Sequence, residues 1–414
     1  MLDLLIDQSK DISSRKSNKL STMSTQPVLN FGAGPAKIPE SVLKRAQAEL
    51  LNYDNTGMSV MELSHRSKTF GEVLARTKAN LKELMCIPDN YEVIFMQGGA
   101  TTQFAAIFYN LVAAKQIALQ RANKSADEPI VVDYLVTGSW SNKAAQEASR
   151  LAQGTSVRVN RALDTKKATG AYGSILPASE WQLSDTQKEN VAYVYYCDNE
   201  TVHGVEWQQV PDVDPNVPIV ADMSSNFLSK PVDVSRFGVI YGGAQKNLGP
   251  AGVTLVIIRK DLIADLSAGP LRPVMLDYRT MVDNDSMYNT PPTFAIYMVG
   301  LTLEWLLEVG GLQSILVANE RKAEKLYKTI DNSNIFKCPV EPAARSRMNV
   351  VFRLANEDLE KQFLKGAEER NMVQLKGHRS VGGIRASIYN AMPEDHVDQL
   401  IAYMLEFEKT QSSA

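Results

Sequence analysis

The 414-residue sequence has few of the residues that build disulfide frameworks and metal sites. Its three cysteines (Cys86, Cys197 and Cys338) are odd in number and widely spaced, which argues against a disulfide framework or a cysteine-based zinc site. The four histidines are equally far apart, so no metal-ligand spacing appears and no metal is expected. This cysteine usage favours a reducing compartment.

An excess of one charge and long apolar runs are also missing. The formal net charge of −3 leaves none of the basic excess that nucleic-acid-binding proteins carry. No apolar run reaches the roughly 18–20 residues that a membrane-spanning helix needs. Residues 1–25 combine acidic side chains with no apolar core region, so neither a transit peptide nor a secretion signal is indicated. We expect a cytoplasmic protein without nucleic-acid or membrane partners, and a disordered tail over residues 1–25.

Short apolar segments alternate with amphipathic helices, which predicts an α/β protein. The strands are expected at residues 91–96, 130–136, 191–196, 218–221, 237–241 and 253–258, and helices at 67–85, 101–112 and 139–151. Such continuous apolar strands indicate a mostly parallel sheet covered by helices. Beyond residue 310 the rhythm changes to long helices and then strand-helix-strand-helix. We therefore expect a large domain over residues 37–310 and a smaller α/β domain formed by residues 26–36 and 311–414.

A lysine in a glycine-rich turn is the strongest local chemical signal. Lys246 stands in the segment 242–250 (GGAQKNLGP), between two apolar strands. Glycine lets the backbone approach a ligand closely, and a lysine presented in this way suits Schiff-base chemistry with an aldehyde. The same pattern also serves structural and phosphate-binding lysines, so alone it does not identify a cofactor.

An aspartate at the end of the strand before this turn narrows the alternatives. Asp222 ends the apolar run 218–221, where a buried carboxylate is costly without a partner. Open α/β sheets bind ligands at this carboxyl edge. A pyridoxal ring needs a carboxylate opposite its pyridine nitrogen to act as an electron sink, and Asp222 lies one strand unit before Lys246. An ordinary turn or helix-capping aspartate is the alternative.

Two further segments suit a flat, phosphorylated cofactor. Residues 98–103 (GGATTQ) form a small-residue turn between a strand and a helix, where backbone N–H groups and the helix dipole favour an anion. The segment lacks the spacing of a Walker loop or a dinucleotide fingerprint, and a plain turn is the alternative. Trp140 follows the next strand and can stack on a ring, although an isolated tryptophan is more often part of a core.

Basic residues gather in the C-terminal region. Two arginines and a histidine surround three glycines in residues 376–387 (KGHRSVGGIRAS). Arg379 and Arg385 suit carboxylate and phosphate, because a guanidinium binds these groups bidentately. His65 and Arg66, just before the first long helix, form a second basic pair. A solvated surface loop is the alternative for both.

Taken in order, these segments resemble the phosphoserine aminotransferases. The matching motifs are NFGAGPA at 30–36, SHRS at 64–67, NETVHGV at 199–205, DMSSN at 222–226, GAQKN at 243–247, YNTPP at 288–292 and GHRSVGGIRAS at 377–387. The resemblance runs from about residue 27 to the C-terminus. It implies a fold-type I transferase dependent on pyridoxal 5'-phosphate, with a seven-stranded sheet in the large domain, and a homodimer whose active sites are shared at the interface.

The resemblance also implies roles for individual residues. Lys246 would bind the cofactor covalently and then shuttle a proton, Asp222 would pair with the pyridine nitrogen, and Trp140 would stack on the ring. The other cofactor contacts would come from Ala100, Thr101, Thr201 and Gln245, and from Asn289 and Thr290 of the neighbouring subunit. The residues expected to bind the substrate's phosphate and carboxylate are His65, Arg66, His378, Arg379 and Arg385.

The implied reaction transfers an amino group from L-glutamate to 3-phosphohydroxypyruvate, giving O-phospho-L-serine and 2-oxoglutarate in serine biosynthesis. A related aminotransferase acting on alanine, serine or glyoxylate would keep Lys246 and Asp222 but would not need the basic cluster. A cysteine desulfurase would need a reactive cysteine on a mobile loop, and a silent binding protein would not need both Lys246 and Asp222. The sequence departs from the family at Ala100, where glycine is frequent, and in the long stretch 113–129, which we interpret as a surface insertion.

Overall fold

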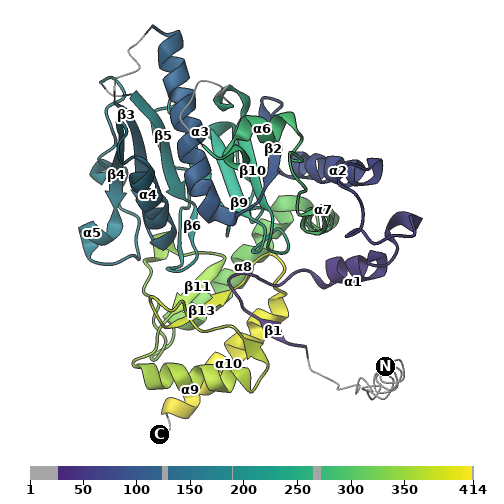
Figure 1. Cartoon of the computed structure of the whole chain (residues 1–414). Helices are drawn as coiled ribbons and strands as arrows, with labels where there is room; N and C mark the ends of the chain where they lie inside the picture. Colours follow the sequence, from purple (N-terminus) through teal and green to yellow (C-terminus); the bar gives the residue numbers. More distant parts are fainter. Residues whose placement is uncertain (1–26, 124–128, 189, 264–271, 413–414) are drawn as a thin grey trace, which may run out of the picture.

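A seven-stranded sheet forms the centre of the computed structural model, which describes residues 27–123, 129–188, 190–263 and 272–412 (Figure 1). The strand order is β2-β10-β9-β8-β5-β3-β4. These strands are β2 (Tyr91–Met96), β3 (Ile130–Val136), β4 (Val157–Asp164), β5 (Asn190–Cys197), β8 (Ile219–Asp222), β9 (Val239–Gly243) and β10 (Thr254–Arg259). Only β10 runs antiparallel to its neighbours, so the predicted, mostly parallel sheet is confirmed.

The single reversed strand leaves all the others pointing the same way. Because β10 is antiparallel to both β2 and β9, those two strands are parallel to each other. The carboxyl ends of β2, β3, β4, β5, β8 and β9 therefore lie on one edge of the sheet. The polar segments that follow these strands in sequence are gathered there, where open α/β sheets bind their ligands.

Helices cover both faces because the apolar side chains of each strand alternate between them. In β10, Val256 packs with α3 (Gly99–Arg121) and α4 (Ser139–Leu151), whereas Leu255 and Ile257 pack with α2 (Lys68–Met85) and α7 (Thr293–Glu308). Each face thus has its own apolar core. Figure 1 shows α3 and α4 in front of the sheet, and α7 together with α2 beside the end that holds β2 and β10.

The C-terminal part builds a third core with the first strand of the described chain. The strand β1 (Leu29–Asn30) pairs in parallel with β12 (Met372–Val373), and β11 (Asn349–Phe352) pairs antiparallel with β13 (Ile384–Ser387). Three helices pack around these strands: α8 (Gly311–Asp331), α9 (Glu357–Glu368) and α10 (Glu394–Ser412). At its start, α8 contributes Leu312 and Ile315 to the large core, and further along it contributes Leu326 to the small one. The division into two domains at residue 310 stays a prediction.

Short elements complete the described chain. They are α1 (Glu40–Glu49), α5 (Thr165–Thr169), α6 (Tyr278–Asp283), β6 (Asn199–Glu200) and β7 (Val205–Glu206), with six single turns of 3-10 helix. Within the described ranges no single helix is long and apolar enough to cross a membrane, and only α7 and α8 together, bent by 83°, pass by length and composition.

Two expectations about this chain need correction. The strand β4 was not predicted, because Arg158, Asn160 and Arg161 interrupt its apolar pattern at the edge of the sheet. The helix α3 does not end near residue 112 but continues to Arg121, with Leu119 buried, whereas the expectation that 113–129 is a surface insertion stays a prediction. Residues 124–128 of that stretch, and the predicted tail 1–25, lie outside the described residues.

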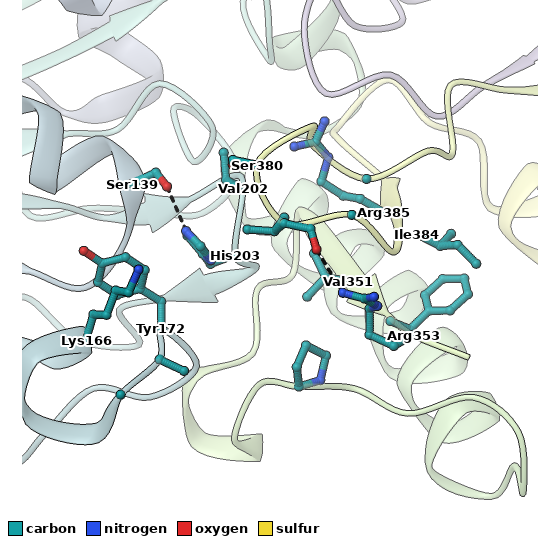
Figure 2. A pocket seen from close by; sticks show the side chains of 17 residues that line it. Ser139, Lys166, Tyr172, Val202, His203, Val351, Arg353, Ser380, Ile384 and Arg385 are labelled. Atoms are coloured by element: carbon teal, nitrogen blue, oxygen red, sulfur yellow. Dashed lines mark hydrogen bonds between the residues drawn. The ribbon is translucent and has the colours of Figure 1, made fainter. Parts of the chain in front are cut away.

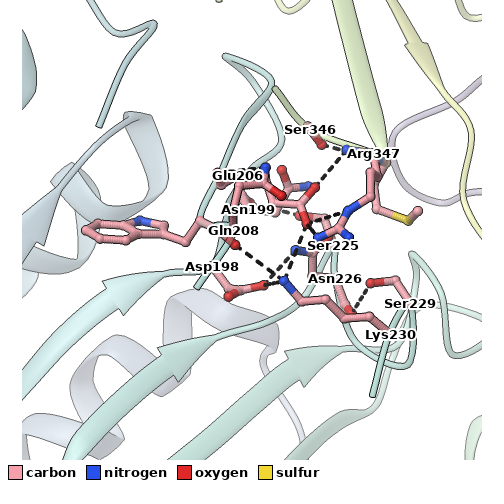
Figure 3. Close-up of polar contacts among 12 residues, drawn as sticks. Asp198, Asn199, Glu206, Gln208, Ser225, Asn226, Ser229, Lys230, Ser346 and Arg347 are labelled. Atoms are coloured by element: carbon pink, nitrogen blue, oxygen red, sulfur yellow. Dashed lines mark hydrogen bonds and ion pairs between the residues drawn. The ribbon is translucent and has the colours of Figure 1, made fainter. Parts of the chain in front are cut away.

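Buried charges join the large sheet to the C-terminal part (Figure 3). Glu206 of β7 is fully buried and accepts hydrogen bonds from the backbone N (2.7 Å) and Nε (3.1 Å) of Arg347, just before β11. Lys230 Nζ lies 3.4 Å from the Glu206 carboxylate and 3.7 Å from that of Asp198. Because each buried charge has an opposite partner, this network fixes how the two parts meet.

Candidate active site

Lys246 lies in the loop after β9, at the carboxyl edge of the sheet. Its Nζ donates a hydrogen bond to Thr201 Oγ1 (2.7 Å) and lies 5.7 Å from the centroid of the Trp140 ring. Partial burial lowers the pKa of the Lys246 amine, although the nearby Asp222 carboxylate acts in the opposite direction. An amine of lowered pKa loses its proton more readily and becomes a better nucleophile and proton acceptor.

Asp222 is a buried carboxylate without a cationic partner. Its Oδ1 accepts hydrogen bonds from the backbone N (2.9 Å) and hydroxyl (2.6 Å) of Ser224, and its Oδ2 accepts one from the Tyr241 hydroxyl (3.0 Å). Within the ranges that the structure covers, it forms no ion pair. Three neutral donors leave acceptor capacity on a charge that is costly to bury. The arrangement suits a positively charged N–H group of a ligand.

Neighbouring side chains tie Asp222 and Lys246 to one another. The Ser224 hydroxyl that binds Asp222 also accepts a hydrogen bond from the backbone N of Gly243 (3.2 Å), three residues before Lys246. Behind Asp222, the buried hydroxyls of Tyr241 and Tyr195 lie 2.7 Å apart. Neither Ser224 nor Tyr241 was predicted to belong to the site. The signals for them were the DMSSN motif at 222–226, which contains Ser224, and the position of Tyr241 five residues before Lys246.

Thr201 follows β6 and orients its hydroxyl toward Lys246. Its Oγ1 donates to Ser225 Oγ (3.0 Å), which leaves its lone pairs for the Lys246 amine. Its backbone oxygen accepts a hydrogen bond from Arg385 Nη1 (3.3 Å). Thr201 therefore links the lysine to the C-terminal basic residues.

Trp140 lies in the first turn of α4, against the same lysine. Its backbone N donates to Glu200 Oε2 (2.8 Å), which anchors this turn. Its indole Nε1 is buried and has no hydrogen-bond partner among the described residues. Lys143 Nζ also lies against the ring, 4.6 Å from its centroid. A flat aromatic surface beside two ammonium groups suits a planar anionic ligand.

The turn before α3 presents a helix N-terminus at this edge. Gly98 and Gly99 have φ angles of 95° and 66°, in the left-handed region that favours glycine. A side chain at Gly98 would meet Thr102 Oγ1 at 2.0 Å. Ala100 and Thr101 occupy the first turn of α3, whose backbone N–H groups suit an anion. Gln245, next to Lys246, accepts a hydrogen bond through its backbone oxygen from Ala36 N (2.9 Å).

The C-terminal basic residues form a cluster beside Thr201. Arg385 is half-buried on β13, burial lowers its pKa, and its Nε has no partner among the described residues. The pKa of His378 is lowered by burial and then by the positive charges of Arg385, Lys143 and Arg379. A cluster that repels protons in this way attracts anions.

A cavity of about 410 Å³ adjoins this cluster between the large sheet and the small α/β part (Figure 2). Its polar lining includes Ser139, Lys166, Tyr172, His203, Arg353 and Arg385. His203 Nε2 hydrogen-bonds to Ser139 Oγ (2.8 Å), and burial lowers the pKa of this histidine to about 4, so it is neutral at pH 7. The sequence analysis did not assign His203 a role, although it lies in the NETVHGV motif.

Four predicted site residues lie elsewhere. Arg66 is exposed and His65 is half-buried before α2, whereas Asn289 and Thr290 are exposed before α7. The backbone oxygen of Thr290 accepts a hydrogen bond from Gln97 Nε2 (3.2 Å), next to the glycine turn. Within the described part of the chain, no hydrogen bond or ion pair joins any of the four to Lys246, Asp222 or Arg385.

The residues at the edge of the sheet fit pyridoxal 5'-phosphate on three independent observations. Among the described residues, Asp222 is a buried carboxylate with no cationic partner, Lys246 is an amine of lowered pKa, and the buried indole Nε1 of Trp140 has no acceptor. A protonated pyridine nitrogen would pair with the first, an aldehyde would react with the second, and an acceptor oxygen of the ligand would satisfy the third.

Comparisons with known proteins agree with this chemistry. The sequence matches the aminotransferase class-V family over residues 28–400. It is 49% identical over 407 residues to phosphoserine aminotransferase 2, chloroplastic, of Arabidopsis thaliana, covering 98% of this chain and 90% of that protein. Phosphoserine aminotransferase from Bacillus circulans subsp. alkalophilus has a similar structure (TM-score 0.83, 43% identity, 93% of this chain and 99% of that chain). So does the pyridoxal-phosphate-bound enzyme from Trichomonas vaginalis (TM-score 0.81, 40% identity, 92% and 100%).

The fold, the lysine–aspartate pair and the family match define a class-V aminotransferase that depends on pyridoxal 5'-phosphate. Within that class, the chain is 40–49% identical, over more than nine-tenths of its length, to the three phosphoserine aminotransferases above. The chain belongs to the phosphoserine aminotransferase family.

Proposed function

We propose that this chain transfers the amino group of L-glutamate to 3-phosphohydroxypyruvate, yielding O-phospho-L-serine and 2-oxoglutarate in serine biosynthesis. The observation that carries this proposal is the position of Arg385. The same side chain belongs to a basic cluster and contacts Thr201, which binds Lys246. A site for anionic substrates thus adjoins the lysine directly. The names of the relatives support the same substrates.

The residues around Lys246 have distinct roles in this reaction. Bound pyridoxal 5'-phosphate supplies an electrophilic carbon and an electron sink. Lys246 would hold the cofactor and then, as a free amine, would take the proton from the substrate α-carbon at Nζ and deliver it to a different carbon, so that the amino group can leave the substrate. Asp222 would keep a proton on the pyridine nitrogen, and Trp140 would stack on the ring and exclude water. Ala100, Thr101, Thr201 and Gln245 would supply the other contacts that hold the cofactor.

The basic cluster selects the substrate. A phosphate monoester carries close to two negative charges at neutral pH, in addition to the substrate carboxylate. Arg385, whose Nε has no partner among the described residues, binds the carboxylate next to Thr201, and His378 and Arg379 bind the phosphate or the γ-carboxylate of glutamate. An aminotransferase for alanine or glyoxylate would need only the first of these contacts.

A homodimer explains the residues that lie away from the lysine. Asn289 and Thr290 are exposed close to the glycine turn, and His65 and Arg66 lie on the surface before α2. We propose that a second copy receives these residues at its own active site, where they complete the phosphate sites of cofactor and substrate. We also predict a cytoplasmic location, which imaging of the tagged full-length chain tests.

A substrate panel tests the proposal. The purified protein is incubated with pyridoxal 5'-phosphate and L-glutamate, and 2-oxoglutarate is measured with 3-phosphohydroxypyruvate, hydroxypyruvate, pyruvate or glyoxylate as acceptor. We expect the phosphorylated acceptor to exceed the others in kcat/KM by at least about 100-fold, because charge-assisted bonds to phosphate contribute roughly 1.5–3 kcal/mol each. Equal or better use of pyruvate or glyoxylate would favour the alternative aminotransferases.

A further inference from the structure

Glu200 is a buried carboxylate with unusual partners. It is fully buried in β6, one residue before Thr201. Its Oε2 accepts a hydrogen bond from Trp140 N (2.8 Å), and its Oε1 accepts from the backbone N (2.8 Å) and hydroxyl (2.5 Å) of Ser141. Within the described ranges it forms no ion pair. Burial raises the pKa of Glu200, whereas these three donors and the positive end of the α4 dipole act in the opposite direction and favour the charged form.

This carboxylate occupies the place of a missing helix cap. Helices usually begin with a side chain that accepts hydrogen bonds from their own first turn. The residue before α4 is Gly138, which has no such side chain, and a Cβ added there would lie 2.3 Å from Glu200 Cδ. The cap of α4 therefore comes from Glu200 of β6, which lies 62 positions after Gly138 in the sequence.

A cap delivered from a distance fixes two parts of the site relative to each other. Trp140 and Thr201 both lie against the Lys246 amine, the first by its ring centroid at 5.7 Å and the second by its hydroxyl at 2.7 Å. Glu200 binds the backbone of the first and immediately precedes the second. Its own backbone oxygen closes the following turn by accepting from His203 N (3.0 Å) and Gly204 N (2.8 Å). A local cap at residue 138 would stabilise α4 without this connection.

We infer that Glu200 is a positioning residue, which holds Trp140 and Thr201 in register around Lys246 and places a fixed negative charge near its amine. This inference rests on the proposed role of Lys246. Burial lowers the pKa of the Lys246 amine, and the Glu200 charge, at its place in this geometry, is one of the influences that act in the opposite direction.

Relocating the cap separates positioning from helix stability. In Glu200→Gln the side chain keeps its size, but its NH₂ group faces a backbone N–H and cannot accept. In the double variant Glu200→Ala with Gly138→Asn, the space vacated by Glu200 admits a local cap that carries no charge, and the extended backbone at residue 138 accommodates asparagine (φ −173°). Asn356→Ala is the matched control: it removes a side-chain cap that accepts from two backbone N–H groups at α9, in the small α/β part.

Three readouts are compared on the loaded enzymes: melting temperature, kcat and KM, and the pH midpoint of the visible absorbance of the cofactor bound at Lys246. We expect Glu200→Gln to lower kcat by about tenfold or more with KM within about twofold, since small misplacements at a reacting centre are costly. The pH midpoint should shift downward because a negative charge is lost. Asn356→Ala should change only the melting temperature.

The double variant distinguishes a positioning role of Glu200 from a role as a helix cap alone. We expect it to regain the wild-type melting temperature to within about 3 °C while kcat and the pH midpoint stay altered. Recovery of all three readouts would show that Glu200 only caps a helix and would overturn the inference, as would wild-type kcat and midpoint in Glu200→Gln. If Glu200→Gln does not fold, the double variant alone decides by the same readouts. A wild-type enzyme without absorbance at Lys246 would instead overturn the proposed role of that lysine.

Discussion

Replacing Asp222 by asparagine isolates the charge at the pyridine nitrogen. The side chain keeps its size and one oxygen, which can still accept from Ser224, while its NH₂ group can donate to the Tyr241 hydroxyl oxygen, so the fold should persist. What is lost is a buried, charge-assisted bond, which contributes about 1.5–3 kcal/mol, and part of the larger cost of about 3–5 kcal/mol of breaking a buried ion pair. The expected loss is smaller than that of breaking an ion pair, because the pyridine nitrogen can give up its proton and then leaves no unpaired charge buried. A loss of about 2–4 kcal/mol corresponds to a fall in kcat of roughly 30- to 1000-fold.

The chain offers a matched control for this variant. Asp133 is also buried in the central sheet and also accepts from neutral donors only: Asn160 Nδ2 (2.8 Å), Ser184 N (3.0 Å) and Ser184 Oγ (2.8 Å). Both variants are assayed by 2-oxoglutarate formation from L-glutamate with 3-phosphohydroxypyruvate as acceptor and saturating pyridoxal 5'-phosphate. Asp133→Asn should reduce the melting temperature and leave kcat within about twofold of wild type. If Asp222→Asn loses less than about tenfold, or no more than Asp133→Asn, the electron-sink role is refuted.

Three further predictions concern the substrate, the dimer and pH. Arg385→Ala and Arg379→Ala should each raise KM for 3-phosphohydroxypyruvate by about tenfold or more, with lysine at either position restoring only part; unchanged KM in steady-state kinetics would mark the cluster as a solvated loop. Lys246→Ala and Asn289→Ala proteins should be inactive or weak separately and regain activity as mixed dimers; no recovery despite subunit exchange, followed by native mass spectrometry, would place Asn289 in its own subunit's site. Because folding lowers the pKa of His203 from 6.5 to about 4, the unfolded chain binds the additional proton between these values, so the free energy of unfolding should fall as pH decreases from about 6.5 to 4. Urea titrations of His203→Gln should show a flatter dependence, and an identical one would contradict the assignment.

The sequence predicted those features that depend on local pattern. Continuous apolar runs gave six strands of the sheet, and the parallel rule then placed Asp222 and Lys246 on one edge. The strand β4 escaped prediction because at the sheet edge its polar residues remain half-exposed, so the apolar signal is weak. The C-terminal half of α3 was not predicted because the apolar residues of this helix are not confined to one face, so no helical periodicity marks where it ends.

Residues that act through distant neighbours could not be predicted from spacing. Nothing near Gly138 in the sequence indicates that Glu200 caps α4, because the contact depends on the neighbouring positions of β3 and β5 in the sheet. Tyr241 reads as a buried strand residue, and its hydroxyl contact with Asp222 follows only from strand pairing. The roles of Asn289 and His65 stay predictions, because a single chain places neither near the lysine.

The most direct test of the account is to locate the covalent attachment of the cofactor. The wild-type enzyme is loaded with pyridoxal 5'-phosphate, reduced with borohydride, digested and analysed by peptide mass spectrometry. The account predicts that the yellow colour is bleached and that the cofactor's mass is added to Lys246 alone, with none in Lys246→Ala. Attachment at another lysine, such as Lys143 beside Trp140, or no attachment at all, would contradict it.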